Sequence, residues 1–379
     1  MKRFWPLWAF MLACPLLVGG NYSRGETSLL ESYSTPGDPI PQNAITELMN
    51  RHNVPGVSIA VIHNGGIDWA AGYGVREFGR DEVVDTKTLF QAASISKPVS
   101  AVVALRLVAG NELDLDEDVN RRLQSWKVPE SDLTRERTVT LRGILSHSAG
   151  LTMHGVPQFE ANAEVPTLVE ILNGEFSGAS EKVHLFAKPG TTFRYSGGGY
   201  IVLQVLLEDV TGRPFPELAR EGVLTPAGMP SSTFAQPLPE DLRHNTAVGH
   251  LVDGTPLEGS WHTLPEQAAG GLWTTPTDLA SFMLAVWRSY HGRSDSLWPQ
   301  PLARAMLTRQ VGDFGLGFSL PSEGVFRFQH GGGNAGDRCH MVLSVDNPDG
   351  VVIMTNGDAG ESVIWEVFSA IARAYGWTA

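Results

Sequence analysis

The sequence predicts an α+β fold, in which an antiparallel sheet is flanked by helices and carries an inserted, mainly helical domain. Strand patterns occur near both ends of the 379-residue chain, and turn signals join neighbouring strands. Between about residues 110 and 270 the strand patterns thin out, and short helical stretches alternate with Gly/Pro turns. We therefore expect a sheet domain of residues 42–109 plus 271–379, and a helical insertion domain of residues 110–270.

The N-terminal elements are a helix, a hairpin and a second helix. Residues 43–50 carry Ile45 and Leu48 on one helical face. Residues 56–62 and 67–72 are β-rich runs on either side of Asn64-Gly65, a pair that favours a tight hairpin turn. A helix should follow Ser94 and end near residue 108. Its apolar positions cover most of its circumference, which predicts that it is buried.

Further helices and strands are expected along the rest of the chain. In the middle, residues 168–172 and 199–210 give the clearest helical patterns. Residues 278–290 form an amphipathic pattern with an acidic first turn, and residues 362–375 close the chain as a helix. Between these last two helices we expect strands at residues 315–320, 325–329, 338–345 and 351–355.

The composition excludes several classes of protein. Hydrophobic residues make up 42% of the chain and charged residues 18%, which is typical of a globular rather than a disordered protein. The net charge is −13 and there is no run of basic residues, so nucleic acid is not expected as a partner. No lysine follows Lys188, so any cation in the C-terminal strands must be histidine or arginine.

Residues 1–20 have the pattern of a signal peptide. Lys2 and Arg3 precede an apolar stretch that reaches Val18, and small residues follow before Asn21. We expect cleavage there, then a flexible tail at residues 21–41. The mature protein would be periplasmic or secreted and would have no transmembrane span. Lipoprotein anchoring through Cys14 is the less favoured alternative.

The first candidate for chemistry is Ser94-Ile95-Ser96-Lys97, at the expected start of a helix. Residues three apart share a helix face, which places the Lys97 amine beside the Ser94 hydroxyl. Burial can hold a lysine neutral, and a neutral amine can take the serine proton. The N–H group of Ser94 would favour a developing oxyanion at the helix start. A chance match is the alternative, because a four-residue pattern is weak by itself.

Two glycine-rich segments are further candidates. Tyr195 precedes glycines at 197–199, and a tyrosine at a loop–helix junction can share protons with a nearby amine. His330 precedes glycines at 331–333, which would let a substrate approach a strand closely. A histidine there could donate to a substrate carboxylate or shuttle a proton. Each segment by itself is also typical of an ordinary turn.

Other catalytic arrangements have less support. The segment Gly317-Phe318-Ser319-Leu320-Pro321 fails the G-x-S-x-G pattern at its last position. The eleven histidines form no H-x-H or H-E-x-x-H pair, so no metal site is expected. His147 precedes a helix-ending glycine and is interpreted as structural. Cys339 is interpreted as a small buried side chain rather than a nucleophile.

Together these motifs resemble those of the penicillin-recognising serine hydrolases. Their order and spacing match an S-x-x-K at Ser94-Ile95-Ser96-Lys97, a Y-x-N-like Tyr195-Ser196-Gly197 and a K-T-G-like His330-Gly331-Gly332. Residues 145–151, 189–191 and 269–273 are also similar to family segments. The resemblance covers roughly residues 44–375. It is closest to the branch of class C β-lactamases, D-alanyl-D-alanine carboxypeptidases, D-aminopeptidases and family VIII esterases.

The resemblance implies a role for each matching residue, in a cleft between the sheet and the inserted helical domain. Ser94 would be the acylated nucleophile, and Lys97 with Tyr195 would form the general base system. His330 would stand where the family has its third-motif cation. The backbone N–H groups of Ser94 and Gly333 would form the oxyanion hole. The positions expected to contact substrate are Gly197, Gly331 and Gly332. No metal or organic cofactor is implied.

Two departures from the family pattern bear on the substrate. Gly197 replaces the asparagine whose amide contacts the acyl side-chain carbonyl of β-lactams, and this puts efficient β-lactamase activity in doubt. His330 replaces lysine, which leans toward peptide-like or D-amino-acid amide substrates. We expect an exported serine hydrolase that acts through an acyl-enzyme on the ester, amide or β-lactam carbonyl of a small molecule. The alternatives are a carboxylesterase for short acyl esters and a non-hydrolytic penicillin- or peptidoglycan-binding sensor. The natural substrate, the primary base and the oligomeric state stay open.

Overall fold

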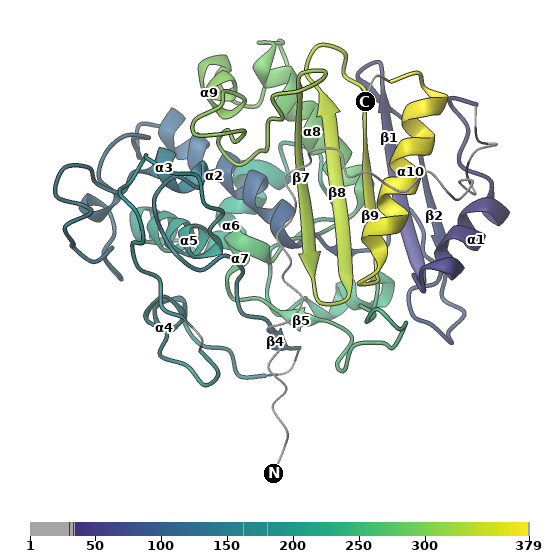
Figure 1. Ribbon diagram of the computed structural model, residues 1–379, viewed down its shortest axis with the longest axis horizontal. Coiled ribbons are helices and arrows are strands. Elements are labelled where there is room, and N and C mark those ends of the chain that lie inside the picture. The colour runs from purple at the N-terminus through teal and green to yellow at the C-terminus, as the bar shows by residue number, and fades with distance from the viewer. Residues whose placement is uncertain (1–29, 31–32, 34, 162, 180, 378–379) are drawn as a thin grey trace.

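The structure is a computed structural model that describes residues 30, 33, 35–161, 163–179 and 181–377. A five-stranded antiparallel sheet occupies one side of the molecule, and most of the helices lie on the other (Figure 1). The strand order is β2-β1-β9-β8-β7, so strands from both ends of the chain pair directly. The α+β fold class is thereby confirmed. The expected signal peptide and Cys14 lie outside the described residues.

The sheet strands are β1 (Gly56–His63), β2 (Gly66–Gly74), β7 (Arg327–Asn334), β8 (Asp337–Ser344) and β9 (Gly350–Thr355). Short paired strands elsewhere are β3 (Phe90–Gln91) with β6 (Trp273–Thr274), and β4 (Phe159–Glu160) with β5 (His262–Thr263). The helices are α1 (Gln42–Arg51), α2 (Ser96–Ala109), α3 (Leu141–Leu145), α4 (Leu168–Asn173), α5 (Gly197–Thr211), α6 (Phe215–Ala219), α7 (Gln267–Gly270), α8 (Pro276–Tyr290), α9 (Gln300–Met306) and α10 (Gly360–Ala374).

Apolar side chains project from both faces of the sheet and form two hydrophobic cores, one on each face. Helices α1 and α10 cover one face, where Ile59 and Ile353 are fully buried. Helices α2 and α8 lie against the other face, where Ala60 and Val352 are fully buried. Successive strand residues point to opposite faces, so a strand covered on both sides is apolar at nearly every position, as β1 is.

The predicted elements agree with the structure except before and within β7. The Asn64-Gly65 turn is confirmed, with both residues at positive φ. The strand expected at residues 315–320 is wrong, because this stretch forms bends and only isolated bridges. Gly317, at a φ of +94°, packs tightly against α2 there. The glycines after His330 form no turn; they continue β7 up to its hairpin with β8.

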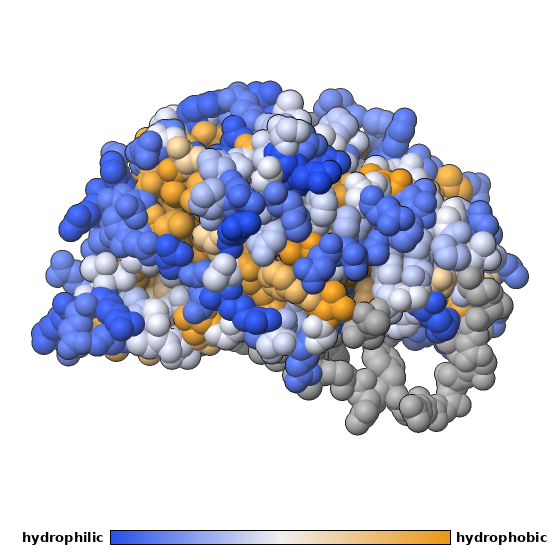
Figure 2. Space-filling view, turned by 90° about the horizontal axis from the view of Figure 1, so that it is seen from above, coloured by the Kyte–Doolittle hydropathy of each residue, from blue (hydrophilic) through white to orange (hydrophobic). Residues whose placement is uncertain are grey.

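The outer surface is mostly polar in the view of Figure 2, and apolar residues appear mainly in gaps between polar side chains. Among the described residues, no helix is long and apolar enough to cross a membrane.

Candidate active site

Ser94 lies in a single turn of 3-10 helix, Ala93–Ile95, that leads directly into α2. Its neighbours Ala93 and Ile95 are buried, whereas Ser94 is partly exposed. Ala93 adopts a φ of +47°, in the left-handed region that an alanine rarely occupies. Such strain persists where the surrounding structure fixes it, and it is common at functional sites. The serine expected as nucleophile is therefore presented by a sharp, buried turn.

Lys97 points from the first turn of α2 into the protein and is only 2% exposed. Its Nζ donates to Ser94 Oγ at 3.1 Å and to the Ala269 carbonyl oxygen of α7 at 2.7 Å. Burial lowers the pKa of this amine from 10.5 to about 7. A substantial fraction of the lysine is therefore neutral at neutral pH, and a neutral amine beside a serine hydroxyl can accept its proton.

Tyr195 comes from the segment just before α5, and its ring centroid lies 5.0 Å from Lys97 Nζ. The helix start is held by Ser196, whose Oγ accepts from the Gly199 amide at 2.9 Å and donates to the Thr152 carbonyl oxygen at 2.7 Å. These bonds fix the backbone beside the tyrosine. The structure thus brings together Ser94, Lys97 and Tyr195, as the sequence predicts.

His147 contacts this group directly, which its interpretation as a purely structural residue missed. Its ring stacks on Tyr195, with centroids 4.1 Å apart and planes 30° apart. Its Nδ1 accepts from the Ser196 amide at 3.1 Å. Burial, with the nearby charge of Lys97, holds the pKa of His147 well below 6.5. The sequence signal that could have found His147 is the resemblance of residues 145–151 to a family segment, but that resemblance does not by itself predict the contact with Tyr195.

His330 lies on β7 at the edge of the sheet, with its ring centroid 6.2 Å from that of Tyr195. It is 6% exposed, and its Nδ1 lies 2.6 Å from the Gly331 carbonyl oxygen. A carbonyl oxygen only accepts, so Nδ1 carries the proton and Nε2 a lone pair. Burial and then the charge of Lys97 lower the pKa of His330 to about 3. The imidazole occupies the third-motif position without supplying a positive charge at neutral pH.

Strand β7 passes very close to Ser94. A Cβ added to Gly332 would lie 2.3 Å from the Ala92 carbonyl oxygen and 3.2 Å from the Ser94 amide nitrogen. Only glycine fits this contact. Gly331 is half-buried and Gly333 is exposed on the same strand. The approach of β7 to the Ser94 amide is what a two-amide oxyanion hole requires. The use of the Ser94 and Gly333 amides remains a prediction.

Cys339 lies beside the close contact between Gly332 and Ala92, and it is buried, as expected. Its Sγ lies 3.1 Å from the Ala92 carbonyl oxygen. Burial raises the pKa of the thiol well above its usual range, which does not suit a nucleophile.

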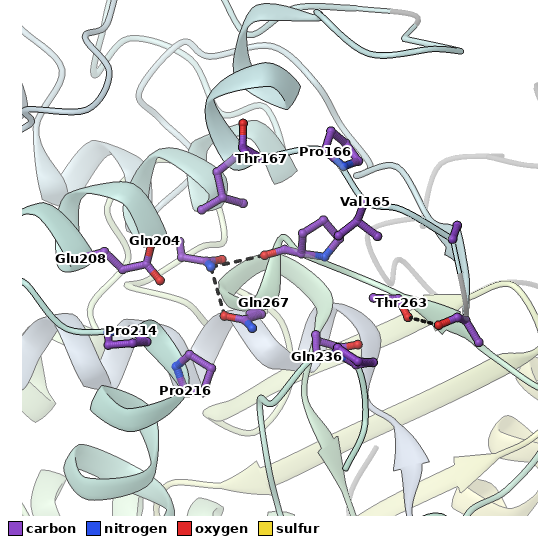
Figure 3. A pocket seen from close by; sticks show the side chains of 15 residues that line it. Val165, Pro166, Thr167, Gln204, Glu208, Pro214, Pro216, Gln236, Thr263 and Gln267 are labelled. Atoms are coloured by element: carbon purple, nitrogen blue, oxygen red, sulfur yellow. Dashed lines mark hydrogen bonds between the residues drawn. The ribbon is translucent and has the colours of Figure 1, made fainter. Parts of the chain in front are cut away.

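A pocket of about 380 Å³ is lined by Gln204 of α5 and Gln267 of α7, among other residues (Figure 3). None of the predicted site residues lines it. Gln204 Nε2 donates there to Gln267 Oε1 at 3.1 Å and to the Pro265 carbonyl oxygen at 3.3 Å. The pocket and the site share α7, which supports the pocket wall through Gln267 and holds Lys97 through Ala269.

Comparisons with known proteins identify the family and support the fold. The family model described as Beta-lactamase matches residues 42–366. The chain is 28% identical over 345 residues to penicillin-binding protein 4 of Amycolatopsis lactamdurans, covering 86% of this chain and 87% of that one. It is 28% identical over 235 residues to the unguisins hydrolase ungD' of Aspergillus campestris, covering 58% and 41% respectively. Its fold is similar to that of EstCE1, a hydrolase with promiscuous acyltransferase activity. That likeness has a TM-score of 0.69 and 19% identity, and it covers 87% of this chain and 97% of that one.

Proposed function

Because the chain belongs to the beta-lactamase family of serine hydrolases, we propose that it cleaves acyl substrates through a covalent intermediate on Ser94. The observation that carries this is the buried Lys97 amine, 3.1 Å from Ser94 Oγ. Neutral Lys97 takes the hydroxyl proton as Oγ bonds to the substrate carbonyl carbon. The carbonyl oxygen gains negative charge, which the Ser94 and Gly333 amides stabilise.

The remaining steps return the proton and release the acyl group. The proton taken from Ser94 passes to the leaving alcohol or amine as its bond to the carbonyl carbon breaks. Water then attacks the acyl-enzyme and gives its proton to Lys97, directly or through Tyr195. That proton passes to Ser94 Oγ as its bond to the acyl carbon breaks, which frees the acid and the serine. His147 stacks on Tyr195 and keeps that ring in place beside Lys97.

Within this reaction class, short uncharged acyl esters are the favoured substrates. The reason is His330, which is neutral at the position where the family pattern has a cation. A carboxylate beside the scissile bond, as in β-lactams and peptide C-termini, would find no third-motif charge to pair with. The neutral state of His330 therefore disfavours D-amino-acid amides, although a histidine at this position led us to expect such substrates from the sequence. The similarity to hydrolases such as ungD' and EstCE1 supports an ester or amide hydrolase.

A substrate panel tests the proposal and separates its alternatives. Parent and Ser94→Ala proteins are compared on p-nitrophenyl butyrate, D-alanine p-nitroanilide and nitrocefin. We expect the parent to turn over the ester fastest and the variant to lose turnover and labelling by a fluorophosphonate. Parental ester turnover by Ser94→Ala would exclude the mechanism. A burst of product with no steady state would instead identify a sensor that acylates and stalls.

Export stays part of the proposal and is supported by the pattern of residues 1–20. Fractionation of cells that express the full chain tests it. We expect the protein outside the cytoplasm with Asn21 as its first residue, and a full-length cytoplasmic product would contradict export.

A further inference from the structure

In the motif Tyr195-Ser196-Gly197, the third residue is a glycine, and residues 153–156 fill the space that a side chain there would occupy. A Cβ on Gly197 would lie 2.9 Å from Val156 Cγ1 and 3.1 Å from the His154 carbonyl oxygen. The Gly197 amide donates to that same oxygen at 3.0 Å, and the Gly198 amide donates to the Met153 carbonyl oxygen at 3.0 Å. Residues 153–156 are thus tied to the start of α5, in the place where an asparagine side chain would have to fit.

This segment brings the imidazole of His154 to the site. The residue is exposed, and its ring centroid lies 5.1 Å from that of Tyr195. Neither of its ring nitrogens makes a hydrogen bond with any described residue, whereas Nδ1 of His147 and Nδ1 of His330 each do. Although the residue reaches solvent, packing desolvates part of its side chain, and this lowers the pKa of His154; the positive charges of Lys97 and Arg194 lower it further. At neutral pH the ring is uncharged and offers one N–H donor and one lone pair.

We propose that His154 is a specificity-determining residue, which binds the acyl part of the substrate by donating a hydrogen bond to an oxygen in the acyl chain. The inference rests on the proposed function. The asparagine that the family pattern has at position 197 contacts an acyl side-chain carbonyl. The segment that replaces its side chain presents an unused donor against Tyr195. Preferred substrates would therefore carry an acceptor oxygen a few bonds beyond the scissile carbonyl.

Two esters that differ by one oxygen test this directly. The p-nitrophenyl esters of 4-oxopentanoic acid and pentanoic acid have the same chain, and only the first has an acceptor in it. Their kcat/KM ratio is measured for the parent and for His154→Phe, which keeps an aromatic ring but removes the N–H. His154→Gln restores a donor. The matched control is His244→Phe, an exposed histidine whose Nδ1 lies 2.7 Å from the Asp241 carbonyl oxygen.

The parent and His244→Phe should prefer the oxo ester, and His154→Phe should lower that preference about fivefold, the usual effect of one neutral hydrogen bond. His154→Gln should retain it within about threefold. A parental preference in a folded His154→Phe protein would overturn the inference. The proposed function would still stand if fluorophosphonate labelled Ser94 in that protein. Absence of labelling in the parent would instead remove the proposed function itself.

Discussion

Lowering the pH should switch off acylation of Ser94 with a midpoint near the pKa of Lys97. Burial lowers that pKa from 10.5 to about 7. One pKa unit corresponds to about 1.4 kcal/mol, so burial disfavours the ammonium form by about 5 kcal/mol. The neutral amine is the reactive form, and it predominates above the midpoint. Below it the neutral fraction falls about tenfold per pH unit, and kcat/KM should fall with the same slope.

The assay is single-turnover acylation by p-nitrophenyl butyrate, followed at the wavelength where p-nitrophenol and its anion absorb equally. The titration of nearby histidines should not be mistaken for that of Lys97. The pKa of His330 is lowered to about 3, and those of His147 and His154 are lowered below 6.5. A rising limb near 7 therefore reports Lys97. Lys182→Met, at an exposed lysine, should keep the parental profile. A rate that is flat between about pH 5 and 8, or falls as pH rises, would refute the reasoning.

Three further substitutions have defined outcomes. Gly332→Ala should abolish ester turnover, because its Cβ would lie 2.3 Å from a backbone carbonyl oxygen. The control Gly66→Ala, with nothing within 4 Å of its Cβ, should keep the parental rate. Equal rates in the two variants would contradict the close approach of β7 to the segment that carries Ser94. Gly197→Asn restores the family motif but would place its Cβ 2.9 Å from a valine side chain. We expect a loss of about 1–3 kcal/mol in urea unfolding and no gain in nitrocefin hydrolysis, and faster nitrocefin turnover would count against this packing. His147→Phe keeps an aromatic ring beside the tyrosine but leaves a buried backbone amide without its acceptor. We expect stability to fall by about 1–3 kcal/mol and kcat to fall with it, and parental values of both would show that the histidine does not position the site.

Local sequence signals predicted the turns and helices whose conformation depends on their own residues. The Asn64-Gly65 pair produced the expected turn because it tolerates positive φ, and the apolar run of α2 became the expected buried helix. The signals failed around β7. Alternating apolar residues at 315–320 imitate a strand, but this stretch bends against α2. The glycines after His330 have low strand propensity, yet pairing with β8 holds them in the sheet.

The sequence predicted which residues form the candidate site, but it did not predict their burial, their charge states or their tertiary contacts. Spacing placed Lys97 beside Ser94, because both lie at the start of one helix. Burial of the amine and the neutral state of His330 depend on packing from distant segments, which motif spacing does not contain. The roles of His147 and His154 depend on tertiary contacts with Tyr195. No pattern along the chain marks either contact.

The most direct test of the central claim is to locate the acyl group. The parent protein is mixed with p-nitrophenyl butyrate, quenched in acid during turnover and digested, and the acylated peptide is sequenced by mass spectrometry. The account predicts a butyryl group on Ser94 in the parent and none in Lys97→Met, because the neighbouring amine is needed to activate the hydroxyl. Turnover with an acyl group on any other residue, or with an unmodified Ser94 throughout, would contradict it.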